Sequence, residues 1–303
     1  MEPKVTVILP AYNAGQYIEE TIDSVLQQSY RNFELLVIND GSTDDTVALV
    51  EPYTQRDPRV QLISQPNQGV SAARNHGICQ ASGELVAFLD ADDLWVPEKL
   101  EAHVRHLCSD SKLGMSFARI EFIDSDGNRT GQRSNLRLRN ILPHHFYQDN
   151  LACTPSNIVT RRSILQSIGG FDGDLSGLAD IDLFLRICCA GWKVEGLDRV
   201  LVYYRTHAGG MSSQLKRMED EWYRFDAKVA TYNPHLVQKY HPLAQAMVLR
   251  SLARQSLRLK LEPEVGIDFI NRALNANWKL ILNQPKRTLL TLLAVYSRRF
   301  VSM

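Results

Sequence analysis

The sequence predicts an α/β protein with a mostly parallel central sheet, followed by a small α-helical C-terminal region. Over the first 95 residues, short β-rich apolar runs alternate with segments of helical periodicity. Strands that alternate with helices of this length indicate a parallel sheet that is covered by helices. After about Trp222 the strand patterns stop and only helical spacing continues. These observations predict one domain over residues 1–222 and a helical extension over residues 223–303.

Four strands and three helices are predicted at the N-terminal end of the chain. The helix over 43–55 is expected to have Ser42 or Thr43 as its cap and acids in its first turn. Ligands bind outside the carboxyl ends of the strands in such sheets, so the loops that follow the strands should form one rim. The expected strands are 4–10, 33–40, 60–65 and 84–90, the helices are 15–29, 43–55 and 69–81, and the rim loops are 10–13, 39–42, 65–69 and 90–93.

The rest of the chain is predicted to be less regular, with strands first and helices later. A strand over 115–124 leads into an exposed turn and a basic loop. Its successors are a strand, a helix and a glycine stop over 156–172, a helix over 178–192, a strand over 199–207, a helical hairpin over 242–262 and 264–278, and a short apolar helix over 286–300 between basic pairs.

Charge and cysteine usage exclude several classes of protein. The formal net charge is zero, but residues 226–303 carry 12 basic and 4 acidic side chains, which leaves 22 and 30 in residues 1–225. The five cysteines form no Cys-x-x-Cys pair, so they indicate a reducing compartment and neither a disulfide framework nor a zinc site. The sequence shows no signal peptide and no run of about 18 apolar residues. We therefore expect a cytoplasmic protein without a nucleic-acid partner.

An acidic cluster ends the predicted strand over 84–90. Asp90, Asp92 and Asp93 lie within four residues of one another, directly after an apolar run. Two carboxylates about 6 Å apart repel by roughly 3 kcal/mol at an effective dielectric of ~20, so the cluster gains nothing structural from its charge. An acidic surface turn is therefore a poor explanation, and a functional site is favoured.

Several short motifs occur in order along the chain. They are VILPAYN, LLVINDGSTDDT, PNQGVSAARNHG, LVAFLDADD, GGFD, DIDLFLRI and VYYRTH. In this order the sequence resembles the family 2 inverting glycosyltransferases with the GT-A nucleotide-binding fold, over roughly residues 4–215. The resemblance implies a hexosyltransferase that moves a sugar from a nucleotide-diphosphate sugar, with UDP-sugars favoured, to an acceptor hydroxyl. It implies metal-assisted direct displacement with an Asp base, in polysaccharide or glycan biosynthesis.

The resemblance also implies which residues bind the nucleotide. Asp40, at the end of a strand, is expected to contact the base, although a turn-capping Asp explains the same position. Arg74 is expected to contact the nucleotide, with a surface ion pair as the alternative. Asn13 either lines the nucleotide site or caps the helix that follows. The implied nucleotide-binding residues are Pro10, Ala11, Tyr12, Asn13, Asp40, Arg74, Asp90 and Ala91.

Asp90 and Asp92 match the Asp-x-Asp signature of the family, which implies a bound Mn²⁺ or Mg²⁺. Asp92 is expected to bind the metal, and Asp90 to reach the ribose or a metal-bound water. Such ions take one or two carboxylates together with substrate phosphates. His207 either closes the metal site or is a loop histidine without a task. Asp93 is expected to assist, or to cap the helix that begins near Pro97.

Asp180 is the residue that the resemblance implies as the catalytic base. The family usually has Glu-Asp here, whereas this chain has Ala179-Asp180, so it keeps the base and lacks the Glu. An Asp can accept the proton of an acceptor hydroxyl when it lies within hydrogen-bond reach. Asp182 is expected to have a structural role, and Arg205 to offset the charge of the diphosphate.

Two other functions compete with this interpretation. A Rossmann-type dehydrogenase needs Gly-x-Gly-x-x-Gly after the first strand, and this chain has PAYNAGQY there. A non-catalytic sugar-nucleotide-binding or scaffold protein of the same fold would fit Ala179 and the helical extension. Such a protein should have lost Asp90, Asp92 and Asp180, and all three are present.

The expected partners are a nucleotide-sugar donor and a glycan, lipid-linked or protein-linked acceptor. The terminal helix over 286–300 either lies on an anionic membrane or packs on the first domain, whose acidic balance attracts the same basic residues. The first alternative would place the protein at the inner face of the cell membrane.

Overall fold

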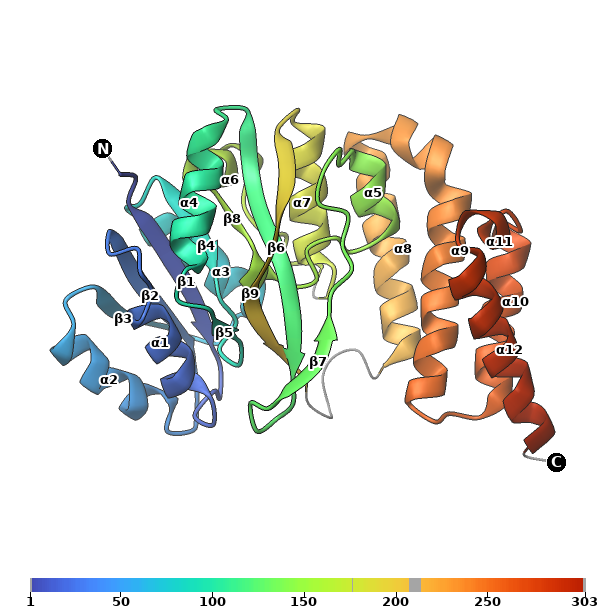
Figure 1. Cartoon of the computed structure of the whole chain (residues 1–303), viewed down its shortest axis with the longest axis horizontal. Coiled ribbons are helices and arrows are strands. Elements are labelled where there is room, and N and C mark those ends of the chain that lie inside the picture. The colour runs from blue at the N-terminus through green and yellow to red at the C-terminus, as the bar shows by residue number, and fades with distance from the viewer. Residues whose placement is uncertain (1, 176, 207–213, 302–303) are drawn as a thin grey trace. The chain divides into compact units, whose positions relative to one another are not determined.

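The structure, a computed structural model, describes residues 2–175, 177–206 and 214–301. The chain divides into two compact units (Figure 1). The first comprises Met1–Leu142 with Leu151–His207, and the second comprises Pro143–Asn150 with Ala208–Met303. The predicted boundary after residue 222 falls within helix α8 (Leu215–Tyr232), and the division into domains 1–222 and 223–303 stays a prediction.

The first unit is built on a nine-stranded sheet in the order β3-β2-β1-β4-β8-β6-β9-β5, with β7 beside β6. β1 to β4 pair in parallel and so do β6 and β9, whereas β5, β7 and β8 pair antiparallel, so the sheet is mixed. Every residue of β1, β2 and β4 is buried, as expected of apolar strands covered on both faces. The strands are β1 (Val5–Ala11), β2 (Phe33–Asp40), β3 (Val60–Gln65), β4 (Leu85–Phe88), β5 (Leu94–Trp95), β6 (Leu113–Ile123), β7 (Arg129–Arg133), β8 (Val159–Arg161) and β9 (Lys193–Arg205).

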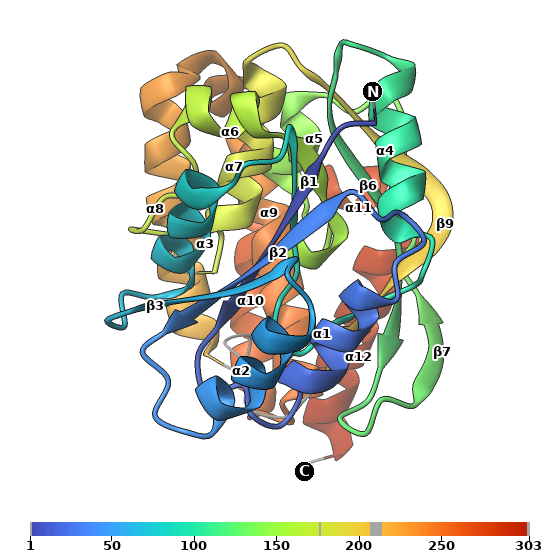
Figure 2. The ribbon, with the colours of Figure 1, turned by 90° about the vertical axis from the view of Figure 1, so that its left-hand side faces the viewer.

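Helices cover both faces of this sheet, which confirms the predicted α/β class. α1, α2 and α4 lie on one face, and α3, α6 and α7 lie on the other (Figure 2). In α1 the predicted apolar residues Ile18, Ile22 and Val25 are buried in the core. The helices are α1 (Ile18–Leu26), α2 (Thr46–Arg56), α3 (Val70–Gln80), α4 (Lys99–Ser109), η1 (Pro155–Asn157, a 3₁₀ turn), α6 (Arg162–Ile168) and α7 (Ala179–Cys189).

Two local predictions in the first unit are wrong. α2 begins at Thr46 and not at residue 43, and its first N–H is bound by Asp44, whose Oδ1 lies 3.1 Å from Thr46 N. Neither Ser42 nor Thr43 is therefore the cap, and the first turn of α2 carries no acid. The segment after β6 is also more than a turn and a loop, because part of it pairs with β6 as β7.

The second unit is helical and has a core of its own. Leu252, Ala253, Phe269 and Ile270 are among the residues that α9 and α10 bury against each other, which confirms the predicted hairpin. Within the described residues, no helix combines the length and apolar character that crossing a membrane requires. The helices are α5 (Pro143–Gln148), α8 (Leu215–Tyr232), α9 (Pro234–Arg258), α10 (Pro263–Ala276), α11 (Leu280–Asn283) and α12 (Pro285–Val301).

The start of α9 differs from the prediction. The helix begins at Pro234 instead of residue 242, because Asn233 caps it with Oδ1 accepting from Leu236 N at 3.1 Å. Pro234 occupies the first helical turn, where a missing N–H costs nothing. The sequence predicts that the helix starts at Pro242, but this proline lies inside the helix.

Candidate functional site

The carboxyl ends of β1, β2 and β4 bring three of the predicted rim loops together. β1 pairs in parallel with both β2 and β4. Residues 10–13 and 39–42 therefore comprise the last two residues of β1 and β2 and the turns after them, and residues 90–93 follow β4 at the same edge of the sheet, as expected from the sequence. Pro10 and Ala11, at the end of β1, are buried, and Tyr12 is 52% exposed.

The β1–α1 loop and the β2–α2 loop bind each other. Asn13 Oδ1 accepts from Thr43 N at 2.8 Å, and Asn13 N donates to Ser42 Oγ at 3.1 Å. Asp44 Oδ2 accepts from Gly15 N at 3.0 Å. Asn13 is in the left-handed region, with φ of 49°, and it does not cap α1, so the helix-cap interpretation of this residue is wrong.

Asp40 is 3% exposed, and its carboxylate binds the loop after β3. Oδ1 accepts from Gln65 Nε2 at 2.8 Å and from Gln68 N at 2.9 Å, and Oδ2 accepts from Gly69 N at 2.8 Å. Gly69 directly precedes α3, so the carboxylate also lies at the N-terminal end of that helix. Asp40 thus stabilises a turn, as the alternative interpretation held, and its contact with a nucleotide base stays a prediction.

Asp90 forms an ion pair with Arg74 of α3. Arg74 Nη2 lies 2.5 Å from Asp90 Oδ1, and the Arg74 side chain is only 8% exposed. The guanidinium also lies over the ring of Phe171, 5.2 Å from its centroid. Ser156 Oγ accepts from Asp90 N at 2.9 Å. Arg74 therefore forms a part-buried ion pair with the acidic loop, and its expected contact with the nucleotide stays a prediction.

Asp93 has a different environment, because its side chain is fully buried. Its Oδ1 accepts from Arg205 N at 2.9 Å. Burial raises the pKa of Asp93 well above the usual range of a carboxyl, and the negative charges of Asp92 and Asp90 raise it further. Asp93 does not cap α4, which begins two residues after Pro97 without a side-chain cap, so that prediction is wrong.

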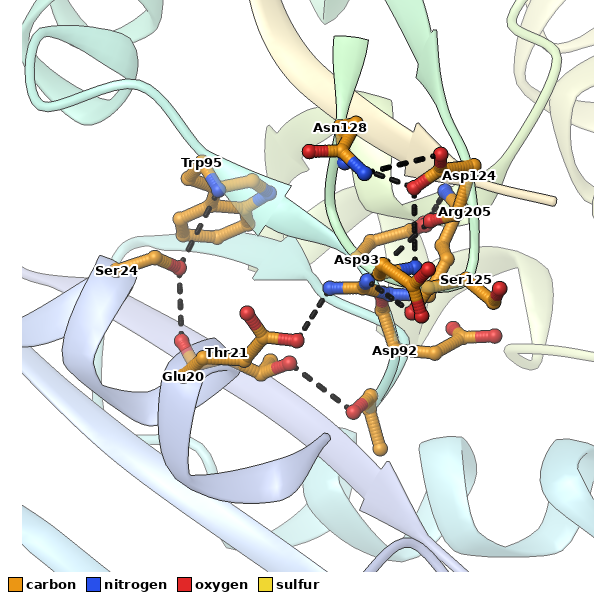
Figure 3. Close-up of polar contacts among 12 residues, drawn as sticks. Glu20, Thr21, Ser24, Asp92, Asp93, Trp95, Asp124, Ser125, Asn128 and Arg205 are labelled. Atoms are coloured by element: carbon orange, nitrogen blue, oxygen red, sulfur yellow. Dashed lines mark hydrogen bonds and ion pairs between the residues drawn. The ribbon is translucent and has the colours of Figure 1, made fainter. Parts of the chain in front are cut away.

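Arg205 links the acidic loop to α1 and to the turn after β6 (Figure 3). Its guanidinium is 1% exposed and forms an ion pair with Glu20 of α1. Nε donates to the carbonyl oxygen of Asp92 at 2.8 Å, and Nη1 donates to that of Ser125 at 2.9 Å. The ring of Tyr17 lies 4.3 Å from the guanidinium. Arg205 is thus buried among protein groups, and the expectation that it meets a diphosphate is wrong.

Asp92 and Ala91 are half-buried, between the buried Asp93 and the ion-paired Asp90. Thr21 Oγ1 of α1 donates to the carbonyl oxygen of Ala91 at 3.0 Å, so the backbone of the Asp-x-Asp stretch is held from α1 as well. Asp92 therefore presents a carboxylate on a loop whose backbone is fixed from several sides.

Asp180 lies at the start of α7. It is the second residue of this helix, is half-buried, and its Oδ1 accepts from Ile181 N at 2.8 Å. Burial raises the pKa of the Tyr204 hydroxyl, and the negative charges of Asp93, Asp90, Asp92 and Asp180 raise it further. The charges of the acidic loop and of Asp180 therefore act on the same tyrosine, at the end of β9.

Asp182 has the structural contact predicted for it. The side chain is fully buried, and its Oδ2 accepts from Arg186 Nε at 2.8 Å. Arg186 in turn donates to the carbonyl oxygens of Ile168 at 2.6 Å and Gly170 at 2.7 Å. This pair therefore binds α7 to the glycine turn that ends α6, where Gly169 is the left-handed C-cap that the sequence predicted.

Asn75 of α3, which was not predicted from the sequence, binds the same glycine turn through Phe171. Its Oδ1 accepts from Phe171 N at 2.8 Å, and its Nδ2 donates to the carbonyl oxygen of Phe171 at 2.7 Å. Arg74 and Asn75 are adjacent in the motif ARN, so one turn of α3 contacts both the acidic loop and the GGFD turn. The motif ARN, already noted for Arg74, was the available signal.

A series of buried polar contacts runs from Ser116 through His103 and Lys99 to Asn157. Lys99 is fully buried, and its Nζ donates to the carbonyl oxygen of Asn157 at 3.2 Å and lies 3.2 Å from His103 Nε2. His103 Nδ1 lies 2.8 Å from Ser116 Oγ. Burial lowers the pKa of both Lys99 and His103 below their usual ranges. Asn157 follows Ser156, the residue that binds Asp90, so this series of contacts ends one residue from a partner of the acidic loop.

The carboxylates of Asp90 and Asp92 fit a Mn²⁺ or Mg²⁺ ion. Among the described residues no three His, Cys, Asp or Glu side chains are grouped as a metal site. These ions, however, often take one or two carboxylates and complete their shell with substrate phosphates and water. Two hard oxygen donors at the rim meet that requirement. His207, the third predicted ligand, lies outside the described residues.

Comparison with known proteins finds glycosyltransferases in each case. The model of the family Glycosyl transferase family 2 matches residues 6–169. A putative teichuronic acid biosynthesis glycosyltransferase, TuaG of Bacillus subtilis, is 39% identical over 226 residues, which are 73% of this chain and 87% of TuaG. An uncharacterized glycosyltransferase of Haemophilus influenzae is 40% identical over 128 residues, 42% of this chain and 51% of that protein. The chain thus aligns with about half the length of the Haemophilus relative.

Solved structures share the fold at lower identity. The mannosyltransferase PcManGT from Pyrobaculum calidifontis, in complex with GDP-Man and Mn²⁺, has a TM-score of 0.62 at 21% identity, over 99% of this chain and 88% of PcManGT. TarS 1-349 of S. aureus, in complex with UDP-GlcNAc, has a TM-score of 0.60 at 20% identity, over 96% of this chain and 81% of TarS. Both likenesses concern the GT-A fold.

Proposed function

Because the chain belongs to glycosyl transferase family 2, we propose that it is an inverting hexosyltransferase that acts in polysaccharide or glycan biosynthesis. It moves a sugar from a nucleotide-diphosphate sugar to an acceptor hydroxyl. The observation that supports this proposal is the position of Asp90 and Asp92 after β4, at the rim of the sheet, with the charge of Asp180 acting on the same tyrosine, Tyr204. The preference for a UDP-sugar rests on the TarS complex with UDP-GlcNAc, while PcManGT binds GDP-Man.

The nucleotide lies against the loops after β1, β2 and β4. Tyr12, 52% exposed, offers a ring face for the base, and stacking of that kind is worth about 0.5–1.5 kcal/mol beyond the buried area. Asp40 supports the adjoining loop at Gln68 and Gly69 and contacts the base at the rim. Arg74 and Asp90 lie nearer the phosphates and the ribose.

Asp92 is the proposed ligand of Mn²⁺ or Mg²⁺, with Asp90 beside it and His207 as a further ligand. The bound ion supplies charge neutralisation for the diphosphate that leaves. Arg74 neutralises Asp90 in the protein itself, so the approach of a diphosphate meets one negative charge fewer. The donor set of two carboxylates suits both ions.

Asp180 is the proposed catalytic base. It lies in the first turn of α7, half-buried, with Oδ1 accepting from Ile181 N. Asp180 accepts the proton of the acceptor hydroxyl as its oxygen bonds to the anomeric carbon. The bond between that carbon and the diphosphate breaks on the opposite face, so the products are an inverted glycoside and a nucleoside diphosphate.

The nucleotide site is tested by calorimetric titration of UDP with and without Mn²⁺. The wild type should bind UDP more tightly with Mn²⁺, and Asp92→Asn should lose about tenfold or more of that affinity. Asp198→Asn, a change of the same kind at a 75% exposed carboxylate of the first unit, should behave as the wild type. Equal UDP affinities with and without metal would refute the metal assignment.

The base is tested by turnover of nucleotide sugars. Asp180→Asn should bind UDP and Mn²⁺ as the wild type does, while sugar transfer or hydrolysis falls by roughly 10²–10⁴-fold. Binding of UDP without any turnover by the wild type, over a full panel of donors and acceptors, would instead support the non-catalytic sugar-nucleotide-binding alternative.

A further inference from the structure

The last helix, α12, buries two threonines and exposes three of its leucines. Thr288 and Thr291 are 0% and 6% exposed, whereas Leu289, Leu290 and Leu293 are 46%, 57% and 64% exposed. A helix that docks on its own domain normally does the reverse, with its apolar stripe facing inward. The three leucines, called here the outer leucine face, therefore do not hold α12 on the second unit.

The buried threonines on the inward face of α12 both have hydrogen-bond partners. Thr288 Oγ1 donates to the carbonyl oxygen of Gln284 at 2.8 Å and accepts from Arg250 Nη1 at 3.2 Å. Thr291 Oγ1 donates to the carbonyl oxygen of Arg287 at 2.8 Å. Because both buried hydroxyls are hydrogen-bonded, burying them costs little, and the orientation of the helix is self-consistent.

Close packing fixes the same orientation. Val295, on the inward face, is 1% exposed and belongs to the core of the second unit. A Cβ added to Gly266 of α10 would lie 3.2 Å from Val295 Cγ1, so the two helices approach closely at this glycine. The outer leucine face is thus the side that α12 turns away from its own core.

The segment before α12 adds exposed apolar and basic side chains. Trp278 and Leu282 are 61% and 67% exposed. From residue 269 to the last residue of the sequence there is no acidic residue, while six basic residues occur. Lys279 and Lys286 are exposed, and the Arg287 side chain is 56% exposed. Exposed leucines and a tryptophan therefore occur in a stretch of uniformly positive charge.

We propose that α12 lies on an anionic lipid surface, with the outer leucine face inserted at the level of the lipid headgroups. Leucines on one side of a helix, with flanking lysines and arginines, are typical of helices that lie in a membrane interface, and tryptophan is enriched at the same depth. Basic residues near an anionic surface add attraction, and the absence of acids means that nothing in this segment opposes it. Non-directional apolar burial together with one sign of charge fits a bilayer better than a protein partner.

The proposal is tested by flotation of the full-length protein with vesicles of phosphatidylcholine, alone or mixed with phosphatidylglycerol. The protein should float with the anionic vesicles and not with the neutral ones. The double variant Leu290→Ser/Leu293→Ser should lose at least about tenfold in partitioning. Lys279→Gln/Lys286→Gln should lose partitioning as well, and added salt should weaken the binding of the wild type.

Leu261→Ser is the matched control, because Leu261 is an exposed leucine of the same unit that lies outside the segment. It should float as the wild type does. All variants should keep the thermal stability and the UDP affinity of the wild type, which separates this test from that of the proposed function.

Three results would overturn the proposal. The first is no flotation with anionic vesicles, or equal flotation of the wild type and Leu290→Ser/Leu293→Ser. The second is a dimer in light scattering that this double variant abolishes, which would assign the face to a second copy of the chain. The third is a lower melting temperature of the double variant without any flotation of the wild type, which would assign the face to an intramolecular contact.

Discussion

Asp90, Asp92 and Asp93 stand almost side by side in the sequence, yet each carboxylate has its own environment. Arg74 compensates Asp90, burial shifts the pKa of Asp93 upward, and Asp92 remains half-buried on a braced loop. An ion pair therefore offsets the charge of Asp90, and burial disfavours the charged form of Asp93.

Asp93→Asn should stabilise the protein increasingly as the pH rises. Since the folded-state pKa of Asp93 is raised above 3.8, the folded state holds a proton that the unfolded state has lost, so stability falls as the pH rises above 3.8 toward the folded-state pKa. An Asn retains the oxygen that accepts from Arg205 N but does not titrate. Urea unfolding across this range should show the variant gaining on the wild type by at most about 1.4 kcal/mol per pH unit. A constant difference would refute the shift.

His103 should give the opposite dependence. Its pKa is lowered by burial and by the charges of Lys99 and His106, so below 6.5 the unfolded state takes up a proton that the folded state does not. Stability should therefore fall as the pH drops below 6.5. In urea unfolding, His103→Gln should lack this component, and the gap between wild type and variant should narrow on acidification. A parallel pH dependence of the two proteins would contradict the assignment.

At the residue scale, the sequence predicted positions better than environments. The pattern of strands and helices placed the loops after β1, β2 and β4 at one rim, because parallel strands end at the same edge of a sheet. The sequence does not reveal burial, however. Arg205 was therefore expected to offset the charge of a diphosphate although its side chain is 1% exposed, and nothing in the sequence indicated that Lys99 is fully buried.

At the scale of elements, α3 shows how closely a helix approaches the sheet beneath the site. Its first turns carry Arg74 and Asn75 to two loops, and Gly77 lets its backbone lie against Ile8 of β1. A Cβ built at Gly77 would be 2.4 Å from Ile8 Cγ2, which a real contact does not allow. The position of both polar residues therefore depends on a glycine that makes no polar contact itself.

Gly77→Ala should destabilise the protein, although alanine is the better helix former by about 1 kcal/mol. Overpacking of a core typically costs about 1–3 kcal/mol, and the methyl branch of Ile8 is too close to its backbone to move away freely. Denaturant unfolding should show a lower midpoint with an unchanged slope. The control is Gly173→Ala, since a Cβ at Gly173 meets nothing within 4 Å. A variant as stable as the wild type would show that α3 shifts without cost.

The limits of sequence prediction for elements lie at their ends. Strand and helix patterns predicted β1 to β4 and α1 to α3, because their periodicities are long enough to be distinct. The predicted start of α2 was wrong, since Ser42, Thr43, Asp44 and Asp45 are all residue types that cap helices. In the structure Asp45 is at the N-cap position, and Asp44 accepts from Thr46 N. β7 was missed because all five of its residues are exposed and show no alternation of apolar side chains.

At the scale of the whole molecule, the two units have separate cores. Val7, Leu35 and Val37 belong to the core of the first unit, and Phe269 and Ile270 belong to that of the second. A substitution that destabilises the core of the second unit should therefore leave nucleotide binding by the first unit largely intact.

Ile270→Ala should loosen the second unit alone. Removing a fully buried isoleucine costs about 2–5 kcal/mol, and the loss should appear as faster hydrogen exchange of amides in α9 and α10. UDP affinity and the exchange of β1 and β2 should not change. Ile38→Ala, an equally buried position in β2, should give the reverse pattern. Faster exchange in both units with either variant would show that they unfold as one body.

The mutual bonds between the β1–α1 and β2–α2 loops matter for engineering of donor specificity. Each loop supplies acceptors for the other's backbone, with Asn13 serving Thr43 and Asp44 serving Gly15. A graft of one loop from a homologue would leave amides of its neighbour without a partner and distort both. The smallest transplantable cassette is therefore two segments, about 30 residues apart in the chain, that must be exchanged together.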